Sequence, residues 1–305
     1  MSFKISKVKL KDREAIARIR GGKDDKSFLY YNDHKYSIRD IPEGMIKHLK
    51  DDEKKQLDNS LSSGFEPQDE YITKLFYECK NFIKKKNCKL LLTNGGKFQY
   101  VPSQKVIERV LICGISGSGK STWASNYIKQ WRKQHGGNSK NRRPFYIVSN
   151  LDNDEVLDKL DPERLSIDQI AHEGVSVDPE DEQSLYDSLL LADDIDTIES
   201  TPIRKSVRGF LNNALEISRH YQTYILITSH VIQNNYTSRI QLNEATNVVL
   251  FPKSNARAVS NYLKTYEYFS QDQVDRVLNC NSRWVMLCKH HTPMYILTER
   301  MVYII

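Results

Sequence analysis

The sequence predicts an α/β fold: a core with a mainly parallel sheet flanked by helices, plus a smaller N-terminal α+β domain. Beyond residue 105, short apolar runs alternate with stretches of helical periodicity, which is typical of a sheet buried on both faces. Before residue 106, short mixed segments are interrupted by glycine and proline. We therefore expect two domains, residues 1–105 and residues 106–305.

The N-terminal domain contains one clear helical pattern. Residues 69–86 carry apolar side chains at helical spacing, which predicts a helix. Residues 89–93 and 98–101 flank the pair Gly95 and Gly96, and this arrangement predicts a β-hairpin. We find no constellation of catalytic residue types in this domain.

The larger domain is expected to alternate strands and helices. Its predicted strands are residues 109–113, 145–148, 189–192, 224–228 and 248–251. Helical spacing predicts helices over residues 120–134 and 203–219. Residues 283–288 and 294–305 are predicted to form further strands.

Composition excludes several classes of protein. Of 305 residues, 39% are hydrophobic and 28% are charged, so the chain is neither disordered nor of low complexity. No apolar run approaches the roughly 18 to 20 residues of a membrane span, and the polar N-terminus is not expected to be a secretory signal. The five cysteines include no CxxC pair, so we expect free thiols in a reducing, intracellular compartment.

Positive charge is concentrated in the first third of the chain. Residues 1–105 contain 23 basic and 15 acidic side chains, a net charge of 23 − 15 = +8, whereas the whole chain carries +6. Such a segment suits a polyanion such as nucleic acid. Solvated lysine-rich helices would give the same excess, and the sequence leaves both interpretations open.

Residues 114–121, GISGSGKS, match the pattern G-x-x-x-x-G-K-[ST] at every position. Glycines let the backbone wrap phosphates, and the following helix offers its positive N-terminal end. We expect Lys120 to reach the β- and γ-phosphates of ATP and Ser121 to bind Mg²⁺. The predicted nucleotide-binding residues are Gly114, Ser116, Gly117, Ser118, Gly119, Lys120, Ser121 and Thr122.

Two further strands are predicted to end in polar residues at the same edge of the sheet. The run LLLA precedes Asp193 and Asp194; we expect Asp193 to hold Mg²⁺ and Asp194 to polarise the attacking water. The strand YILIT precedes Ser229 and His230, candidates for contacting the γ-phosphate or the water. A helix cap or a core histidine would look similar.

An arginine is expected to stabilise charge on the γ-phosphate, often from a neighbouring subunit. Arg204 and Arg208 share a helix face just after the acidic pair, and Arg208 is our candidate catalytic arginine. Arg219, Arg239 and Arg257 are alternatives that the sequence does not exclude.

Several of these segments together resemble one superfamily. GISGSGKS, LLLADD, and SRHYQTYILITSH followed by NEATNVVLFPKS are similar to the FtsK–HerA ATPases, and especially to the poxvirus-type genome-packaging ATPases of large DNA viruses and virophages. The resemblance covers residues 107–305. Many members have Glu where this chain has Asp194, and Gln where it has Ser229 and His230.

The resemblance implies a RecA-like P-loop core in a homo-oligomeric ring, a pentamer or hexamer. Such a ring would drive double-stranded DNA, without sequence specificity, into a preformed viral capsid. It would act in the host cytoplasm or viral factory, and transiently at the capsid.

Two segments are candidates for touching DNA. One is a basic cluster at the end of the first predicted helix and the loop after it, comprising Lys129, Arg132, Lys133, Lys140, Arg142 and Arg143. The other is the polar loop 230–243. Either segment would also be compatible with a solvated loop.

Two other functions compete with the packaging motor. A P-loop kinase would need a mobile arginine-rich lid, and no compact lid is visible in the sequence. A non-catalytic nucleotide-binding assembly factor would not need Lys120, Ser121, Asp193 and Asp194 to be intact. The acidic pair favours activation of water over phosphate transfer to a substrate.

Overall fold

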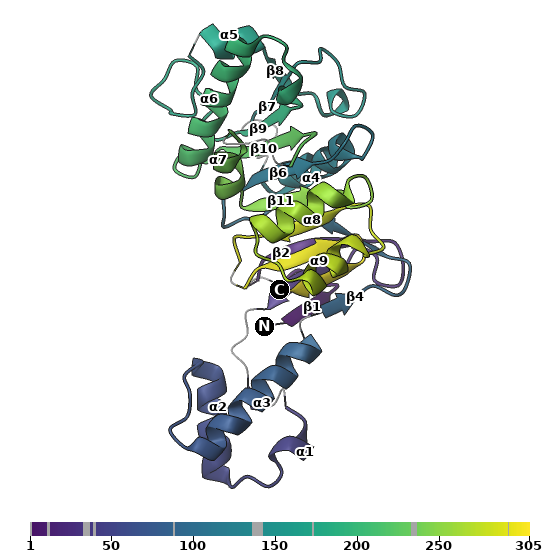
Figure 1. The fold of residues 1–305 in the computed structure, drawn as a ribbon, viewed down its shortest axis with the longest axis vertical. Coiled ribbons are helices and arrows are strands. Elements are labelled where there is room, and N and C mark those ends of the chain that lie inside the picture. Colours follow the sequence, from purple (N-terminus) through teal and green to yellow (C-terminus); the bar gives the residue numbers. More distant parts are fainter. Residues whose placement is uncertain are drawn as a thin grey trace. The chain divides into compact units, whose positions relative to one another are not determined.

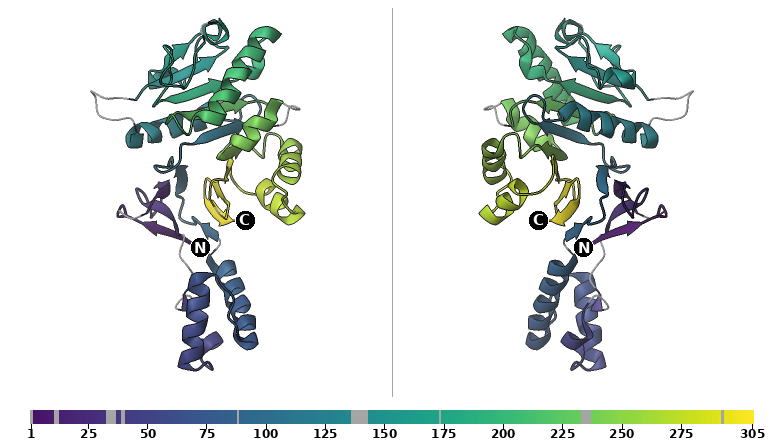
Figure 2. Two further views of the ribbon diagram at one scale, coloured as in Figure 1. Left: turned by 90° about the vertical axis from the view of Figure 1, so that its left-hand side faces the viewer. Right: turned by 90° about the vertical axis from the view of Figure 1, so that its right-hand side faces the viewer.

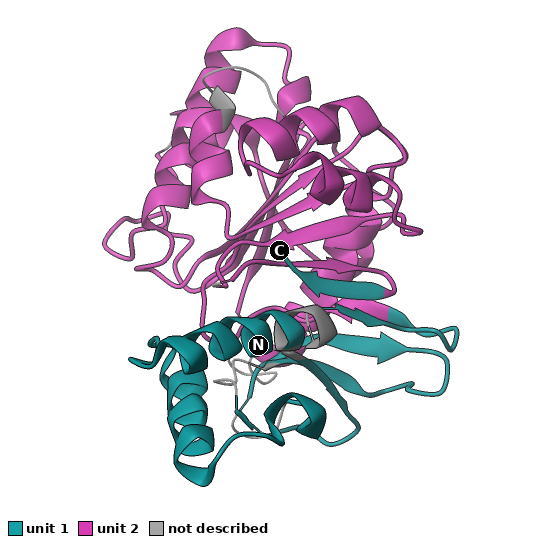
Figure 3. Cartoon of the chain, turned by 60° about the horizontal axis from the view of Figure 1, so that its bottom comes forward, with its two compact units in different colours: residues 1–97, 301–305 teal, residues 98–300 magenta. Residues whose placement is uncertain are grey.

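The fold is described from a computed structural model of the chain (Figure 1). The structure describes residues 2–10, 13–32, 37–38, 41–87, 89–135, 143–172, 174–232, 237–291 and 293–305. The chain divides into two compact units, residues 1–97 with 301–305, and residues 98–300 (Figure 3). Residues 98–105 thus lie in the second unit and residues 301–305 in the first, unlike the predicted division at residue 105.

The first unit combines antiparallel strands with helices. Strands β1 (Ser2–Ser6), β3 (Phe28–Asn32) and β2 (Ala15–Arg20) are neighbours in that order. The helices are α1 (Glu43–Ile46), α2 (Asp51–Ser63) and α3 (Glu70–Asn87), the last confirming the predicted helix. Leu57 and Leu61 of α2 pack in one buried cluster with Ile72 and Phe76 of α3. The unit is therefore α+β, as predicted.

The predicted hairpin around Gly95 and Gly96 is wrong. Strand β4 (Lys89–Leu91) pairs antiparallel with β14 (Met301–Ile304), and β5 (Lys97–Tyr100) belongs to a different sheet. The glycines serve a close approach between two turns instead. A Cβ on Gly22 would lie 2.2 Å from the Asn94 carbonyl oxygen, and one on Gly96 would lie 2.9 Å from the Gly21 carbonyl oxygen. Only glycine fits at such a backbone contact.

The second unit is built on one large sheet with strand order β13-β12-β11-β6-β10-β9-β7-β8. Its strands are β6 (Arg109–Cys113), β7 (Phe145–Ser149), β8 (Glu163–Leu165), β9 (Leu189–Asp193), β10 (Tyr224–Ser229), β11 (Asn247–Leu250), β12 (Val285–Cys288) and β13 (Tyr295–Thr298). Neighbours from β11 to β8 run parallel, whereas β12 and β13 are antiparallel additions. The predicted mainly parallel sheet is confirmed.

Helices lie on both faces of this sheet, with α4 on one face and α8 and α9 on the other (Figure 2). The helices are α4 (Lys120–His135), α5 (Ile167–His172), α6 (Thr201–Ile217), α7 (Thr237–Glu244), α8 (Ala256–Thr265) and α9 (Gln271–Leu278). Because both faces are covered, every residue of β9 and β10 is buried. The polar side chains that end these strands therefore stand out as candidates for function.

Two compositional predictions can be compared with the structure. Cys79, Cys113 and Cys288 are buried free thiols and Cys280 is partly buried, while Cys88 lies outside the described residues. Among the helices that the structure describes, none combines the length and the apolar character that crossing a bilayer requires.

Candidate active site

The loop between β6 and α4 is shaped by its glycines. Gly117 and Gly119 have φ of +72° and +109°, values that residues other than glycine rarely adopt. Gly114 has no such φ but has no room: a Cβ there would lie 2.5 Å from Ser118 Oγ and 2.8 Å from the ring of Phe251. Phe251 directly follows β11, the parallel neighbour of β6. The sequence pattern thus corresponds to a tightly packed turn on the sheet.

The same loop has an unused polar group. Ser118 Oγ is buried and has no hydrogen-bond partner among the residues that the structure describes. The loop residues Ile115, Ser116 and Gly117 are exposed, and α4 begins directly after the loop with its free backbone N–H groups. An orphaned hydroxyl beside the positive end of a helix fits an anionic ligand such as phosphate.

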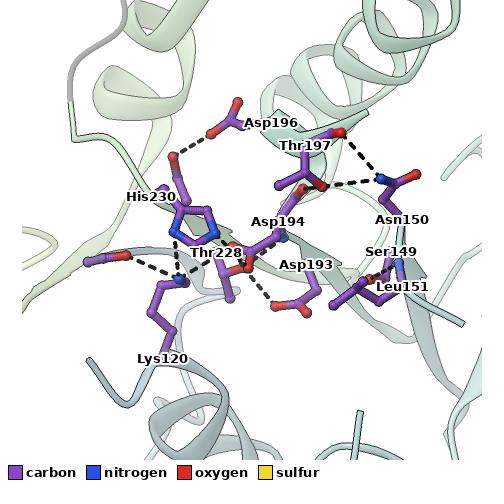
Figure 4. A network of polar contacts seen from close by, with 12 residues as sticks. Lys120, Ser149, Asn150, Leu151, Asp193, Asp194, Asp196, Thr197, Thr228 and His230 are labelled. Carbon is purple, nitrogen blue, oxygen red and sulfur yellow. Dashed lines mark hydrogen bonds and ion pairs between the residues drawn. The ribbon is translucent and has the colours of Figure 1, made fainter. Parts of the chain in front are cut away.

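Lys120, the first residue of α4, is 6% exposed although it carries a charge. Its Nζ donates to the Gly114 carbonyl oxygen at 3.1 Å, lies 3.4 Å from His230 Nδ1, and lies 3.5 Å from Asp194 Oδ1 (Figure 4). These contacts compensate a buried ammonium group. They also bring four of the predicted site residues together, Lys120, Gly114, Asp194 and His230.

The two acids occupy different environments. Asp193 ends β9, is 3% exposed, and accepts a hydrogen bond from Thr228 Oγ1 at 2.7 Å. Burial raises the pKa of Asp193, and the Thr228 hydrogen bond opposes this rise. Asp194 has left-handed backbone angles (φ +47°, ψ +40°), so the chain turns there and the carboxylate faces Lys120 and His230.

Thr228 contacts both acids because β10 is the parallel neighbour of β9. Its Oγ1 accepts from the Asp194 backbone N–H at 2.9 Å and lies 3.1 Å from Asp194 Oδ1, besides its bond to Asp193. From the sequence, Thr228 was predicted only to be part of a strand. Its position at the carboxyl end of β10 was the available indication of this role.

Ser229 and Arg208 meet at a residue that the sequence analysis did not single out. Ser229 Oγ donates to Asp196 Oδ2 at 2.6 Å, and the Arg208 guanidinium donates to Asp196 Oδ1 at 2.7 Å. Asp196 lies in the short 3₁₀ helix Ile195–Thr197 after the acidic pair. Ser229 and Arg208 are therefore linked through Asp196, whereas His230 contacts Lys120 and Asp194 directly.

A second group behind Asp194 was also missed. Thr197 Oγ1 donates to the Asp194 carbonyl oxygen at 2.8 Å, and Asn150 Nδ2 donates to the Thr197 carbonyl oxygen at 3.3 Å (Figure 4). Asn150 follows β7, whose last residue Ser149 is in register with Asp193. The strand-end rule applied to β7 would have suggested Asn150. These contacts fix the turn that carries the acids.

The remaining predicted basic residues are spread over the second unit. Arg204 donates to the Ile198 carbonyl oxygen, Arg219 donates to His220, and Arg239 and Arg257 are exposed. In the predicted basic cluster, Arg132 donates to Leu160 and Asp161 carbonyl oxygens and Arg143 pairs with Asp187 at 3.0 Å, while Lys129 and Lys133 are exposed. Lys140 and Arg142 lie outside the described residues, as do residues 233–236 of the polar loop.

Comparison with known proteins identifies a relative by sequence. The chain matches no family model. The uncharacterized protein V3 of the Sputnik virophage is 36% identical over 211 residues, which cover 68% of this chain and 82% of V3.

Two solved structures are similar to this chain at a lower sequence identity. The genome packaging NTPase B204 from Sulfolobus turreted icosahedral virus 2, solved with sulfate, is 11% identical with a TM-score of 0.40, over 63% of this chain and 96% of B204. The cytoplasmic domain of the Type VII secretion ATPase EccC from Thermomonospora curvata is 11% identical with a TM-score of 0.42, over 70% of this chain and 28% of EccC.

The sequence match to the virophage protein shows that the chain belongs to the family of Sputnik virophage protein V3.

Proposed function

We propose that this protein is an ATP-hydrolysing motor that translocates double-stranded DNA into a viral capsid. The observation that carries the proposal is the meeting of Lys120, Asp194 and His230 at the carboxyl edge of β6, β9 and β10. Ligands of such sheets gather at this edge. We propose DNA and the capsid as partners because the surrounding segments resemble those of genome-packaging ATPases.

The residues present fit a nucleoside triphosphate with Mg²⁺. The loop 114–119 provides a glycine-lined cradle with the orphaned Ser118 hydroxyl, and Lys120 provides the positive charge. Ser121, in the first turn of α4, and Asp193 would hold Mg²⁺, which usually takes one or two protein oxygens together with phosphate oxygens. When bound, Mg²⁺ would neutralise charge on the β- and γ-phosphates.

Hydrolysis requires a group that orients water toward the γ-phosphate. We assign this role to Asp194, because its carboxylate is less buried than that of Asp193, with 19% of its side chain exposed, and lies next to Lys120. Ser229, the last residue of β10, and His230, the residue after it, are our candidates for sensing the γ-phosphate. Lys120 would bind the phosphate oxygens through its ammonium group.

A DNA motor also needs a surface for its track. The excess of basic side chains in residues 1–105 and the exposed Lys129 and Lys133 of α4 are the candidates. Homo-oligomeric ring assembly, capsid binding and action inside the host cell belong to the same proposal. Contacts of this kind to the phosphate backbone would carry no sequence specificity.

The test is steady-state ATP hydrolysis with and without double-stranded DNA, using Lys120→Ala as the blank. We expect hydrolysis to rise on addition of DNA and to be absent in the blank. The mass of the oligomer, measured by light scattering, should be that of a pentamer or a hexamer. Full turnover in the blank would contradict the assignment of the site. Turnover that ignores DNA, from a monomer or dimer, would favour a P-loop kinase and call for a substrate screen.

A further inference from the structure

His230 is the first residue after β10, and its ring lies between two groups of opposite charge (Figure 4). Nδ1 lies 3.4 Å from Lys120 Nζ, and Nε2 lies 2.9 Å from Asp194 Oδ2. The side chain is 31% exposed. One half-buried ring thus contacts both the phosphate-binding lysine and the acid assigned to water.

The two contacts determine where the imidazole carries its proton. An ammonium group can only donate hydrogen bonds, so Nδ1 must accept from Lys120. A neutral ring that accepts at Nδ1 has its proton on Nε2, and this N–H then donates to Asp194. The contacts therefore place a proton on Nε2, where it can donate to Asp194.

The hydrogen bond from His230 is the shortest polar contact to the Asp194 carboxylate among the described residues. Thr228 has a single hydroxyl proton and lies closer to Asp193 (2.7 Å) than to Asp194 (3.1 Å). The ammonium nitrogen of Lys120 is 3.5 Å away. Among the side chains that contact the Asp194 carboxylate, His230 is therefore the main restraint on its orientation.

A bound phosphate would compete for the partners of Lys120 but not for the hydrogen bond between His230 and Asp194. The three N–H groups of Lys120 face the Gly114 carbonyl oxygen, His230 Nδ1 and Asp194 Oδ1. Phosphate oxygens bound by Lys120 must replace some of these partners. The Nε2–H bond to Asp194 involves no lysine donor, so it can persist when Lys120 turns to the nucleotide.

We propose that His230 is a positioning residue, whose Nε2–H holds the Asp194 carboxylate in its water-facing orientation after a nucleoside triphosphate has drawn Lys120 away. The inference rests on the proposed function, since it needs Asp194 to orient the attacking water. It assigns to His230 a role through Asp194 in place of direct contact with the γ-phosphate.

Two substitutions of His230 distinguish the role of Nε2 from that of Nδ1. A glutamine amide reaches the position of Nε2 and can donate to Asp194, whereas an asparagine amide reaches only the position of Nδ1. We expect His230→Asn to lower kcat for ATP hydrolysis about 10- to 100-fold, the effect of a misplaced reacting group, with KM within about twofold. His230→Gln should restore most of the lost turnover. His220→Asn, at an exposed position beside Arg219, is the matched control, and thermal melting checks that each variant is folded.

Equal turnover of the Asn and Gln variants, whether both high or both low, would overturn the proposal. A further fall in kcat when His230→Asn is added to Asp194→Asn would also overturn it, because a residue that acts through Asp194 should then have no additional effect. A wild-type protein that hydrolyses no ATP, with or without DNA, would contradict the proposed function and this inference together. Wild-type hydrolysis with indifferent His230 variants would contradict this inference alone.

Discussion

The guanidinium group of Arg208 donates a hydrogen bond of 2.7 Å to Asp196 of its own chain. The second oxygen of Asp196 accepts from Ser229, the last residue of β10. Arg208 is thus tied to the strand end inside its own subunit. This favours an action of Arg208 on its own nucleotide site over an action on the site of a neighbouring subunit.

Subunit mixing tests this expectation. Arg208→Ala and Lys120→Ala should each lower ATP hydrolysis, and mixing the two proteins should restore no activity, because each subunit then lacks one residue of its own site. Recovery of turnover in mixed rings would show that Arg208 acts across a subunit interface. A mixture of wild type and Lys120→Ala at the same ratios provides the baseline.

Asp194→Asn should separate binding from chemistry. The amide keeps the size of the side chain but cannot act as a base, so we expect the Kd for ATP to stay within about threefold while kcat falls by about 100-fold or more. Fluorescent nucleotide titration and phosphate release measure the two quantities. Loss of ATP binding in this variant would instead indicate that Asp194 holds the metal.

Gly114→Ala should damage the nucleotide loop by packing alone. The added methyl would lie 2.5 Å from Ser118 Oγ and 2.8 Å from Phe251, so the loop must shift. We expect at least about a tenfold loss of ATP affinity, equivalent to about 1.4 kcal/mol. Gly209→Ala in α6 is the matched control, since nothing lies within 4 Å of its added methyl. It should keep ATP affinity and stabilise the protein by about 0.5–1 kcal/mol. Unchanged affinity of Gly114→Ala would show that the loop tolerates the shift.

A second buried carboxyl lies at the amino end of β6, the strand that leads into this loop. Glu108 directly precedes β6, has no exposed surface, and accepts hydrogen bonds from Tyr127 Oη at 2.6 Å and the Ser103 backbone N–H at 3.1 Å. The Tyr100 hydroxyl donates to it as well. Burial nevertheless raises the pKa of Glu108 to about 7 from an ordinary value of 4.5, since desolvation outweighs these donors.

This raised pKa predicts a pH-dependent stability. The folded protein binds the Glu108 proton more tightly than the unfolded chain, so the resulting stabilisation is complete below pH 4.5 and is lost as pH rises through about 7. The free energy of unfolding of wild type minus that of Glu108→Gln should therefore fall between pH 5 and 8, by about 3 kcal/mol at most. Tryptophan fluorescence in urea measures it, because Trp123, Trp131 and Trp284 all lie in the unit that contains Glu108. A difference that is constant with pH would contradict the raised pKa.

The sequence was sufficient for the elements whose local pattern is strong. The glycine-rich loop with the helix from Lys120 and the buried strand before Asp193 were predictable, because spacing and apolar runs depend on neighbouring residues. The expectation that strand ends meet at one edge brought Lys120, Asp194 and His230 together correctly. The roles assigned to these residues stay predictions.

The rest depended on contacts between distant residues. The left-handed backbone of Asp194, which aims its carboxylate, is a single conformation that no residue pattern indicates. The link from Ser229 through Asp196 to Arg208 requires knowing which way three side chains point. The hairpin prediction failed because Gly22 and Gly96 serve a contact between two turns far apart in the sequence. Local patterns carry no information on such pairings.

The pairing of β4 with β14 has a consequence for biosynthesis. Residues 301–304 leave the ribosome long after β4 does, so the first unit lacks one of its strands throughout synthesis of the second unit. Until then, the edge of β4 is open to pairing with other chains. Production of residues 1–105 alone would leave this edge permanently open. A soluble form of the first unit should therefore carry residues 301–305 through a linker, and folding of the first unit during synthesis should finish only once residues 301–304 have emerged.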